Sequence, residues 1–394
     1  MKKVWITTEL FFPDENATAF ILTHIANALS EYNEVNVICG PSDYSKESRR
    51  STAELDPRVN VCRVSGVKLD KNNILSRVLR FLILTIKLSY ALMKRARKGD
   101  KILVVTNPAP ILLTAAWIKK LRKAELYLLV HDVFPENTVP AGIIKSPDSL
   151  FYKILKAIFN RAYSAADKLI VLGRDMKDVI KDKIGGGRAE DIIIIENWGE
   201  TASIRPKNNV SHVPEVRLQY AGNLGRVQGL MELLSCIHEA DNPVLSYEFW
   251  GDGAVKKDME RYILDNNLSG VSLKGAYARD EQDSILTSCD IAIVTLADGM
   301  YGLGVPSKTY NILAAGKPIL FIGDVRSEIA LLIKENNIGY VFDKHDTEAQ
   351  IRFLKGLTTD SIPELEEKGK RARMLAENSF SEEKIMAKYI ELFK

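Results

Sequence analysis

Short apolar runs alternate with amphipathic stretches from one end of the chain to the other. Runs of strand length bounded by turn residues predict β-strands, and the amphipathic stretches between them, such as residues 17–30 and 111–122, predict helices. Strands that alternate with helices in this way form parallel sheets covered on both faces, so the pattern predicts an α/β fold. The predicted strands are residues 3–8, 35–39, 59–64, 101–106, 126–130, 169–172 and 192–195 in the first half, and 216–220, 245–250, 271–274, 291–296, 319–322 and 340–342 in the second.

The alternation stops once, near the middle of the chain. Residues 201–214 are polar and contain Pro206 and Pro214, which is typical of a linker. A chain of 394 residues is also too long for one ordinary core. We therefore predict a first domain at residues 1–200, a linker at residues 201–214, a second domain at residues 215–378 and a C-terminal helix at residues 379–394.

The composition excludes some function classes. The formal net charge is +3 and 46% of the residues are hydrophobic, so the chain is globular and nucleic acid is not expected as a partner. The four cysteines are widely spaced, form no metal-binding pattern and are expected to pack as small hydrophobic residues in a reducing compartment. The first ten residues lack the apolar run of a signal peptide, which predicts a cytoplasmic protein.

One stretch in the second half predicts a helix that begins at an anion-binding position. Pro306, Ser307 and Lys308 begin a short helix between two predicted strands. A helix start offers free amides and a positive dipole end to an anion, and Lys308 adds a cation. Ser307 is expected to cap the helix amides. The alternative is a plain capped helix with a solvated lysine.

A second stretch, at residues 220–229, has a similar character. Gly222 and Gly225 bracket a turn between a strand and an amphipathic helix, and Arg226 offers a forked donor for phosphate oxygens. The spacing is not the full dinucleotide-binding fingerprint, so this stretch is a weak signal when taken alone. Together the two stretches predict a site for a nucleoside diphosphate.

A third candidate site follows a predicted strand of the first half. His131, Asp132 and Glu136 come directly after the apolar run 126–130, in a chain that has only five histidines. A histidine and two carboxylates at a strand end are candidate reacting groups. The alternative is that His131 and Asp132 only satisfy nearby backbone groups.

Two motifs in the second half resemble those of a known family. The segments AGNLG-x-x-QG at residues 221–229 and PSK-x-x-x-x-LAAGKP at residues 306–318 are similar to those of the retaining glycosyltransferases of family four. The resemblance covers nearly the whole chain, and it is closest to the bacterial branch that adds N-acetylated amino sugars during O-antigen and capsule synthesis. It implies the GT-B architecture, in which two Rossmann-like, doubly wound parallel-sheet domains face each other across a cleft and the last helix crosses back to the first domain.

The resemblance also implies a reaction and its partners. A sugar moves, with retention of configuration, from a nucleoside diphosphate sugar, here UDP-linked, to a polyprenyl-diphosphate-linked saccharide, and no cofactor or metal is expected. His131 would lie beside the transferred sugar, and Asp132 or Glu136 would have an acceptor-binding or orienting role. The rival interpretations are a sugar-nucleotide epimerase or hydrolase of the same architecture, and a nucleotide-sugar-binding protein without turnover.

The donor is expected to bind mainly to the second half. Many relatives carry two glutamates at places where this sequence has Leu303 and Asn311, so the glutamate-based contacts do not transfer. Backbone amides near Gly302 and Gly304 are expected to replace them, and Asn311 can still hydrogen-bond ribose hydroxyls. The implied donor-binding residues are Gly222, Asn223, Gly225, Arg226, Gly251, Gly253, Ala276, Tyr277, Gly302, Gly304, Ser307, Lys308 and Asn311.

One further segment, at residues 75–98, combines apolar and cationic residues. Arg77, Arg80 and Lys87 interrupt it too often for a membrane-spanning helix. Its apolar density and flanking cations suit a helix that lies on the inner surface of the cytoplasmic membrane. The alternative is a domain helix that buries Leu79, Ile83 and Ile86 against the first sheet and ends in a basic cap.

Overall fold

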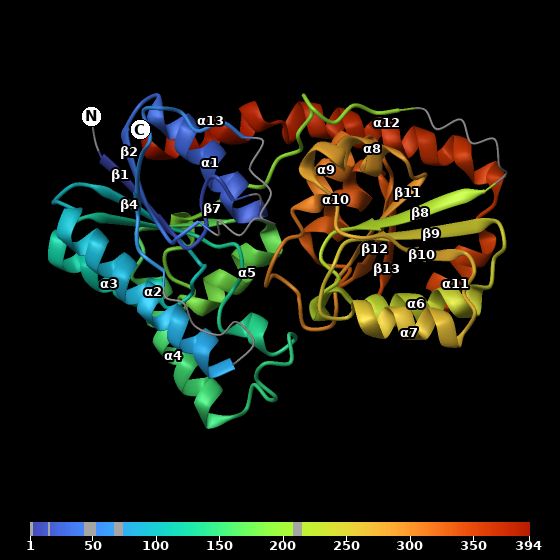
Figure 1. Ribbon diagram of the computed structural model, residues 1–394, viewed down its shortest axis with the longest axis horizontal. Helices are drawn as coiled ribbons and strands as arrows, with labels where there is room; N and C mark the ends of the chain where they lie inside the picture. The colour runs from blue at the N-terminus through green and yellow to red at the C-terminus, as the bar shows by residue number, and fades with distance from the viewer. Residues whose placement is uncertain (1–2, 15, 43–52, 67–73, 208–214) are drawn as a thin grey trace. The chain divides into compact units, whose positions relative to one another are not determined.

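The computed structural model describes residues 3–14, 16–42, 53–66, 74–207 and 215–394, with the side chains of residues 74–78 left out. The chain divides into two compact units (Figure 1). The first contains residues 1–136, 146–196 and 385–394, and the second contains residues 137–145 and 197–384. Each unit is an α/β domain with its own parallel sheet, as the alternating pattern predicts.

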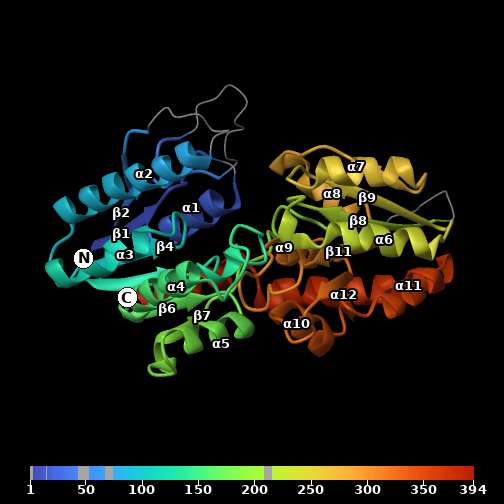
Figure 2. The same ribbon diagram turned by 90° about the horizontal axis from the view of Figure 1, so that it is seen from below.

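The sheet of the first unit has the strand order β3-β2-β1-β4-β5-β6-β7, and all of its pairs are parallel. Helices α2, α3 and α4 lie side by side over one face of this sheet (Figures 1 and 2). The strands are β1 (Lys3–Thr8), β2 (Glu34–Cys39), β3 (Asn60–Arg63), β4 (Lys101–Val105), β5 (Glu125–Leu129), β6 (Lys168–Val171) and β7 (Ile192–Ile194). The helices are α1 (Ala17–Ser30), α2 (Ile74–Arg95), α3 (Ile111–Arg122), α4 (Leu150–Ser164) and α5 (Arg174–Lys183), with the short 3₁₀ turn η2 (Ala189–Asp191). The 3₁₀ turn η1 (Glu136–Thr138) and helix α13 (Glu382–Phe393) each contain residues of both units.

The sheet of the second unit has the order β10-β9-β8-β11-β12-β13 and is also entirely parallel. Its strands are β8 (Val216–Ala221), β9 (Leu245–Trp250), β10 (Val271–Leu273), β11 (Ile291–Thr295), β12 (Ile319–Gly323) and β13 (Gly339–Asp343). Its helices are α6 (Leu230–Ala240), α7 (Lys256–Asp265), α8 (Gln282–Thr287), α9 (Lys308–Ala314), α10 (Glu328–Asn336), α11 (Thr347–Gly356) and α12 (Ile362–Ser379), with 3₁₀ turns η3 (Arg226–Gln228), η4 (Arg279–Glu281) and η5 (Thr359–Ser361).

The central strands are continuous apolar runs because helices cover both faces of each sheet. Every residue of β4, β11 and β12 is buried, and none of these strands alternates between polar and apolar residues. In both sheets the first strand pairs with the second on one side and the fourth on the other. The strand order reverses at this strand, which makes it the topological switch point of the sheet. The loops on its two sides diverge there, and open α/β sheets bind ligands in the resulting crevice beyond the carboxyl ends of the strands.

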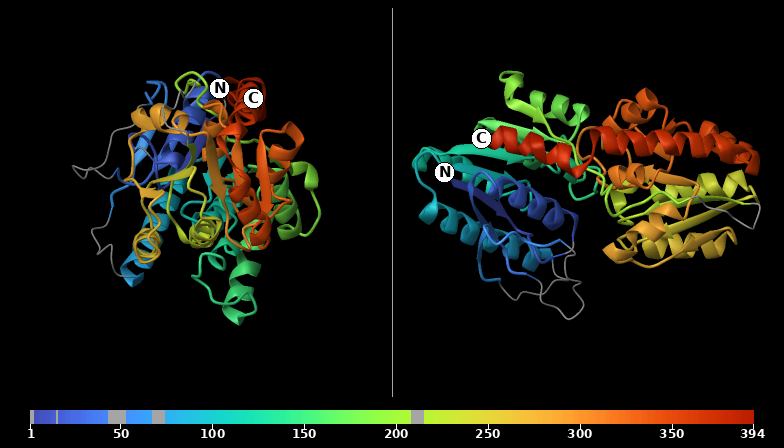
Figure 3. Two further views of the ribbon diagram at one scale, coloured as in Figure 1. Left: turned by 90° about the vertical axis from the view of Figure 1, so that its right-hand side faces the viewer. Right: turned by 90° about the horizontal axis from the view of Figure 1, so that it is seen from above.

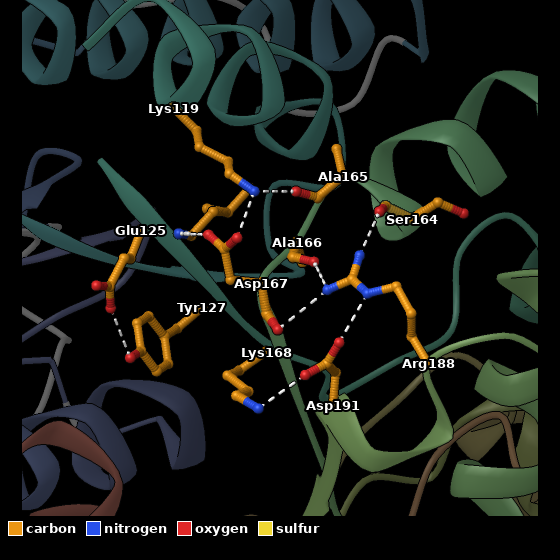
Figure 4. Close-up of polar contacts among 11 residues, drawn as sticks. Lys119, Glu125, Tyr127, Ser164, Ala165, Ala166, Asp167, Lys168, Arg188 and Asp191 are labelled. Carbon is orange, nitrogen blue, oxygen red and sulfur yellow. Dashed lines mark hydrogen bonds and ion pairs between the residues drawn. The ribbon is translucent and has the colours of Figure 1, made fainter. Parts of the chain in front are cut away.

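A polar network fastens the opposite, amino-terminal edge of the first sheet (Figure 4). The Lys119 ammonium of α3 donates to the Asp167 carboxylate at 2.7 Å, and Asp167 also accepts the backbone N–H of Leu126. Asp191 accepts from Lys168 and Arg188, each at 2.7 Å. The network joins strand starts to the ends of helices, so its charges stabilise the fold at an edge remote from the switch point.

The C-terminal end of the chain, residues 385–394, belongs to the first unit (Figure 3). The Phe393 ring lies 4.6 Å from the Tyr127 ring. All four cysteines are free thiols, and Cys39, Cys236 and Cys289 are buried as the composition predicts. Within the described residues, no helix combines the length and apolar character needed to cross a membrane.

Candidate functional site

The loops that follow β8, β9 and β10 are joined to one another at the carboxyl edge of the second sheet. The backbone N–H of Gly222 donates to the Trp250 carbonyl at 2.9 Å, and that of Leu224 donates to the Asp252 carbonyl at 2.9 Å. The N–H of Gly251 in turn donates to the Gly275 carbonyl at 3.0 Å. Three strands therefore end in one continuous backbone ridge.

The glycines of this ridge have a packing reason as well as a chemical one. Gly222 and Gly251 have φ values of +146° and +143°, which side chains of L-residues rarely adopt. A Cβ on Gly251 would overlap the Gly222 carbonyl, and a Cβ on Gly253 would overlap the Leu224 carbonyl. The Gly-Asp-Gly turn is thus required for the two loops to touch, whether or not a ligand is bound.

Lys308, the first residue of α9, points into this ridge. The residue as a whole is half-buried, but its Nζ is out of contact with solvent, lies 3.3 Å from the centre of the Tyr220 ring and has no hydrogen-bond partner among the described residues. A Cβ on Gly222 would lie 3.7 Å from the same Nζ. Burial lowers the pKa of Lys308 well below its usual range, because the charged form loses its hydration. The Tyr220 ring face compensates only part of that loss, so an anion in the turn would complete the site.

The expectation that Ser307 caps α9 is wrong. Ser307 has helical backbone angles (φ −61°, ψ −28°) and its side chain makes no capping bond. The first turn already begins at Pro306, whose carbonyl accepts the Thr309 N–H at 3.1 Å. Ser307 therefore lies inside the turn, where its hydroxyl cannot reach the amides that an N-cap residue binds.

The remaining donor-binding candidates lie on the same edge with more exposure. Asn223 and Arg226 are exposed on the loop after β8, and the buried Gly225 lies between them in sequence. Ala276 is exposed, and Tyr277 makes an edge-to-face contact with Trp250 at a ring separation of 6.3 Å. Gly302, with φ of +65°, and Gly304 belong to the loop between β11 and α9.

Asn311 is bonded within the protein. Its side-chain carbonyl accepts the Glu200 backbone N–H at 3.0 Å, and its amide donates to the Glu200 carboxylate at 3.0 Å and to Gln282 at 3.4 Å. Glu200 also accepts from Arg279 in an ion pair. Because the amide hydrogens of Asn311 are used in this way, its evident role is to hold α9 in place.

In the first unit, Thr106 positions the candidate histidine. The Thr106 hydroxyl oxygen accepts the backbone N–H groups of His131 and Asp132 at 3.1 and 3.2 Å. His131 Nε2 is out of contact with solvent and has no partner among the described residues, and burial lowers the pKa of His131 to about 4. Asp132 is exposed, although the protein around the rest of its carboxyl raises its pKa above the usual range.

Glu136 has a different environment from its two neighbours in the motif. Its carboxylate forms an ion pair with the buried ammonium of Lys183 at 2.8 Å, and Lys156 lies 3.7 Å away. Lys183 also donates to Asn160 at 2.9 Å. This pair links the turn after β5 to α4 and α5, so Glu136 positions the loop that carries His131.

Three residues that contact the candidate site residues were not predicted from the sequence. Tyr220 reads as a strand residue, Thr106 as a strand end, and Glu200 as the end of the first domain. Each matters through a contact between residues far apart in sequence, such as the 111 positions between Glu200 and Asn311. Only the polar Glu200, in a Trp-Gly-Glu turn after a buried strand, carried a local signal that could have been noticed.

Two known sequences are similar to this chain. The chain is 33% identical over 375 residues to the probable glycosyltransferase WbjE of Pseudomonas aeruginosa, covering 93% of this chain and 90% of that one. It is 23% identical over 273 residues to the putative colanic acid biosynthesis glycosyl transferase WcaI of Escherichia coli, covering 66% of each. No protein-family model matches the chain.

Solved structures give the fold. The crystal structure of Anabaena HepE in complex with UDP superposes with a TM-score of 0.71 at 13% identity, covering 100% of this chain and 99% of HepE. Sucrose-phosphate synthase from Thermosynechococcus elongatus superposes with a TM-score of 0.74 at 13% identity, covering 100% and 98%. The two parallel α/β domains are those of the GT-B fold, and the chain belongs to the glycosyltransferases.

Proposed function

We propose that this glycosyltransferase uses a UDP-linked sugar as its donor and acts with retention of configuration. The observation that carries the proposal is Lys308, a buried ammonium group without a hydrogen-bond partner beside a glycine turn. A cation in such a place is costly unless an anion binds it, and the diphosphate of a nucleotide sugar supplies two phosphates. HepE, which has the same fold, was crystallised with UDP.

The demanding step of the reaction is departure of the diphosphate. The bond between the anomeric carbon and the diphosphate oxygen breaks, with its electron pair left on the diphosphate. A bond forms between the anomeric carbon and an acceptor hydroxyl oxygen, and the hydroxyl proton passes to the departing diphosphate. Lys308, Arg226 and the amides near Gly302 and Gly304 would stabilise the charge that develops there. The other donor contacts would come from Gly222, Asn223, Gly225, Gly251, Gly253 and Ser307, with Ala276 and Tyr277 near the base and Asn311 holding α9.

On the sugar side, His131 would contact the transferred sugar. The low pKa of His131 keeps the imidazole neutral at physiological pH, so one ring nitrogen can accept and the other can donate a hydrogen bond. Asp132 is exposed and could bind an acceptor hydroxyl, whereas Glu136 acts through the Lys183 pair.

The finer part of the proposal concerns the two sugars. The motifs of this sequence resemble those of the bacterial branch that adds N-acetylated amino sugars. By analogy, the transferred group is an N-acetylated amino sugar and the acceptor is a polyprenyl-diphosphate-linked saccharide of a surface polysaccharide. The similarity to WcaI, a putative colanic acid biosynthesis glycosyl transferase, supports a role in polysaccharide synthesis.

One assay separates this proposal from its rivals. The purified protein is incubated with UDP-N-acetylglucosamine or another UDP sugar, with and without a lipid-linked acceptor, and release of UDP is measured. A transferase releases UDP only when the acceptor is present. Consumption of donor without acceptor would indicate a hydrolase or epimerase, and binding of UDP without any consumption would indicate a binding protein.

A further inference from the structure

The three helices that cover one face of the first sheet have an unusual composition. Helices α2, α3 and α4 contain no aspartate or glutamate, although the chain has 51 acidic residues. Helix α2 carries five cations, and α3 and α4 carry three each. Three of these cations pair with carboxylates that lie outside the helices, Lys119 with Asp167, Lys153 with Asp148 and Lys156 with Glu136. A solvent-facing helix layer ordinarily mixes both signs of charge, so the excess of cations that the helices themselves carry points to a negatively charged partner.

The same helices expose large apolar side chains. Ten of the fifteen exposed large hydrophobic residues in the described part of the chain belong to them, with Ile86 66%, Trp117 57% and Phe151 66% exposed. The helices bury their opposite sides on the sheet through residues such as Leu88 and Ile118. The exposed set is Leu79, Leu82, Ile86 and Tyr90 on α2, Trp117 and Leu121 on α3, and Leu150, Phe151, Ile154 and Ile158 on α4.

This finding corrects one alternative raised by the sequence. Leu79 and Ile86 are not buried against the sheet; Leu84, Leu88 and Leu92 are. The exposed residues of α2 recur at intervals of three or four, which places them on one stripe of the helix. The stripe is therefore a real apolar surface and not a part of the core.

The three helices form one fixed layer. The Ser89 hydroxyl of α2 donates to the Thr114 hydroxyl of α3 at 2.6 Å. Lys119 of α3 donates to the Ala165 carbonyl just after α4 at 2.8 Å and to Asp167 (Figure 4). These contacts join neighbouring helices to one another, so the apolar residues of the three helices are held in one layer.

We propose that the exposed faces of α2, α3 and α4, here called the outer helix face, form a docking surface for a bilayer that contains anionic lipids. Apolar side chains at the surface enter the headgroup region, and surrounding Lys and Arg side chains bind lipid phosphates. Trp117 has the amphipathic ring that is favoured at such an interface. The proposal extends the surface beyond the segment at residues 75–98 and does not depend on the identity of donor or acceptor.

Charge favours a bilayer over a second copy of this chain. A twofold contact through the outer helix face would bring the cations of both copies together with no carboxylate from these helices between them, and like charges in contact are unfavourable. An anionic leaflet instead places negatively charged headgroups opposite all of the cations of the outer helix face. Each cation near such a surface strengthens binding about fivefold.

The test is flotation of the whole protein with vesicles of phosphatidylcholine alone or with 30 mol% phosphatidylglycerol (about one anionic lipid in three). We expect binding only to the anionic vesicles, with release at high salt. Reversing three exposed cations of the face, Lys94→Glu, Lys120→Glu and Lys153→Glu, should weaken binding by roughly a hundredfold or more. The matched control reverses three exposed cations of the second unit, Lys257→Glu, Arg261→Glu and Lys355→Glu, and should bind like the wild type.

A second pair of variants tests the apolar part. Replacing Trp117 and Ile154 by Ser should weaken binding and abolish a blue shift of tryptophan fluorescence on vesicle addition, whereas replacing the exposed Leu264 and Met374 of the second unit by Ser should change neither. Failure to float with anionic vesicles at low salt overturns the proposal. So does equal binding by the face and control variants, or self-association that the face variants remove. Because flotation needs neither donor nor acceptor, these outcomes leave the proposed transfer reaction to its own assay.

Discussion

The two units share a strand order near their switch points, yet the residues at the carboxyl edges of their sheets differ in kind. In the second unit the edge consists of backbone: glycine loops bonded to one another, with Lys308 directed into them. In the first unit the edge carries side chains, with His131 and Asp132 held by Thr106. A diphosphate is well bound by amides and a cation, whereas a sugar hydroxyl needs directed side-chain partners. We therefore expect the two edges to serve different kinds of recognition.

The helix layers differ as much as the edges. On the second unit, α7 mixes Lys256, Lys257 and Arg261 with Asp258 and Glu260, as an ordinary solvated helix does. On the first unit, α2, α3 and α4 carry cations and exposed apolar residues without a single carboxylate. Since either layer can cover its sheet with the buried side alone, the outer side is free to serve another purpose.

The two edges also have a feature in common. Each buries a basic nitrogen without a hydrogen-bond partner among the described residues, Nε2 of His131 and Nζ of Lys308. In both cases burial lowers the pKa of the group. A buried polar atom left unpaired costs free energy, which is a common sign that a ligand supplies the missing partner. The comparison can be tested by changing one edge at a time.

The largest effect is expected at the second edge. Lys308→Ala should reduce sugar transfer by about 2–4 kcal/mol, or roughly 30- to 1000-fold, because it removes a preorganised cation from the leaving diphosphate. Transfer rate and UDP affinity by calorimetry would measure this. Lys317→Ala is the matched control. Lys317 is also buried, but it lies just before the amino end of β12, whereas the candidate site lies at the carboxyl ends of the strands. Equal activity of the Lys308 variant and the wild type would remove Lys308 from the site.

A smaller effect, with a distinct pH signature, is expected at the first edge. His131 has a folded pKa of about 4, below the value of 6.5 for a free histidine, so between these pH values the unfolded chain binds a proton that the folded chain does not. The free energy of unfolding should therefore fall by about 2 kcal/mol between pH 7 and pH 5 on account of this group. Urea denaturation of the wild type and of His131→Gln at both pH values would show it.

The same residue has an activity prediction. In His131→Gln the pH-dependent loss of stability should be smaller than in the wild type. The activation free energy of sugar transfer should rise by about 1–3 kcal/mol at pH 7, while the affinity for UDP stays unchanged. This outcome would separate the sugar side from the diphosphate side. A variant that transfers normally but unfolds as the wild type does at pH 5 would contradict both parts.

The smallest effect concerns the support of α9. Asn311→Ala removes hydrogen bonds to Glu200 and Gln282, so the free energy of unfolding should fall by about 1–2 kcal/mol while UDP affinity changes little. Thermal unfolding and calorimetry on the same sample would compare the two. A large loss of UDP affinity at normal stability would instead show that Asn311 contacts the nucleotide directly.

What the sequence by itself determined was the local order of the chain. Apolar runs located the described strands of both sheets to within one residue at each end. A strand covered on both faces is apolar over most of its length, as are residues 102–105 of β4 and 291–294 of β11. Glycine spacing and Lys308 likewise marked the loop and helix that meet at the second edge, since backbone conformation and charge are local properties.

The tertiary structure decided which of these residues meet. The burial of Lys308 against Tyr220, the pairing of Glu136 with Lys183 and the support of Asn311 by Glu200 all join residues separated by at least 47 positions. The exposed face of α2 was likewise a matter of packing, because its sequence is apolar on more than one side and only contact with the sheet selects Leu84, Leu88 and Leu92 as the buried side. Periodicity tells which residues share a face of a helix; the neighbours of that face tell whether it is core or surface.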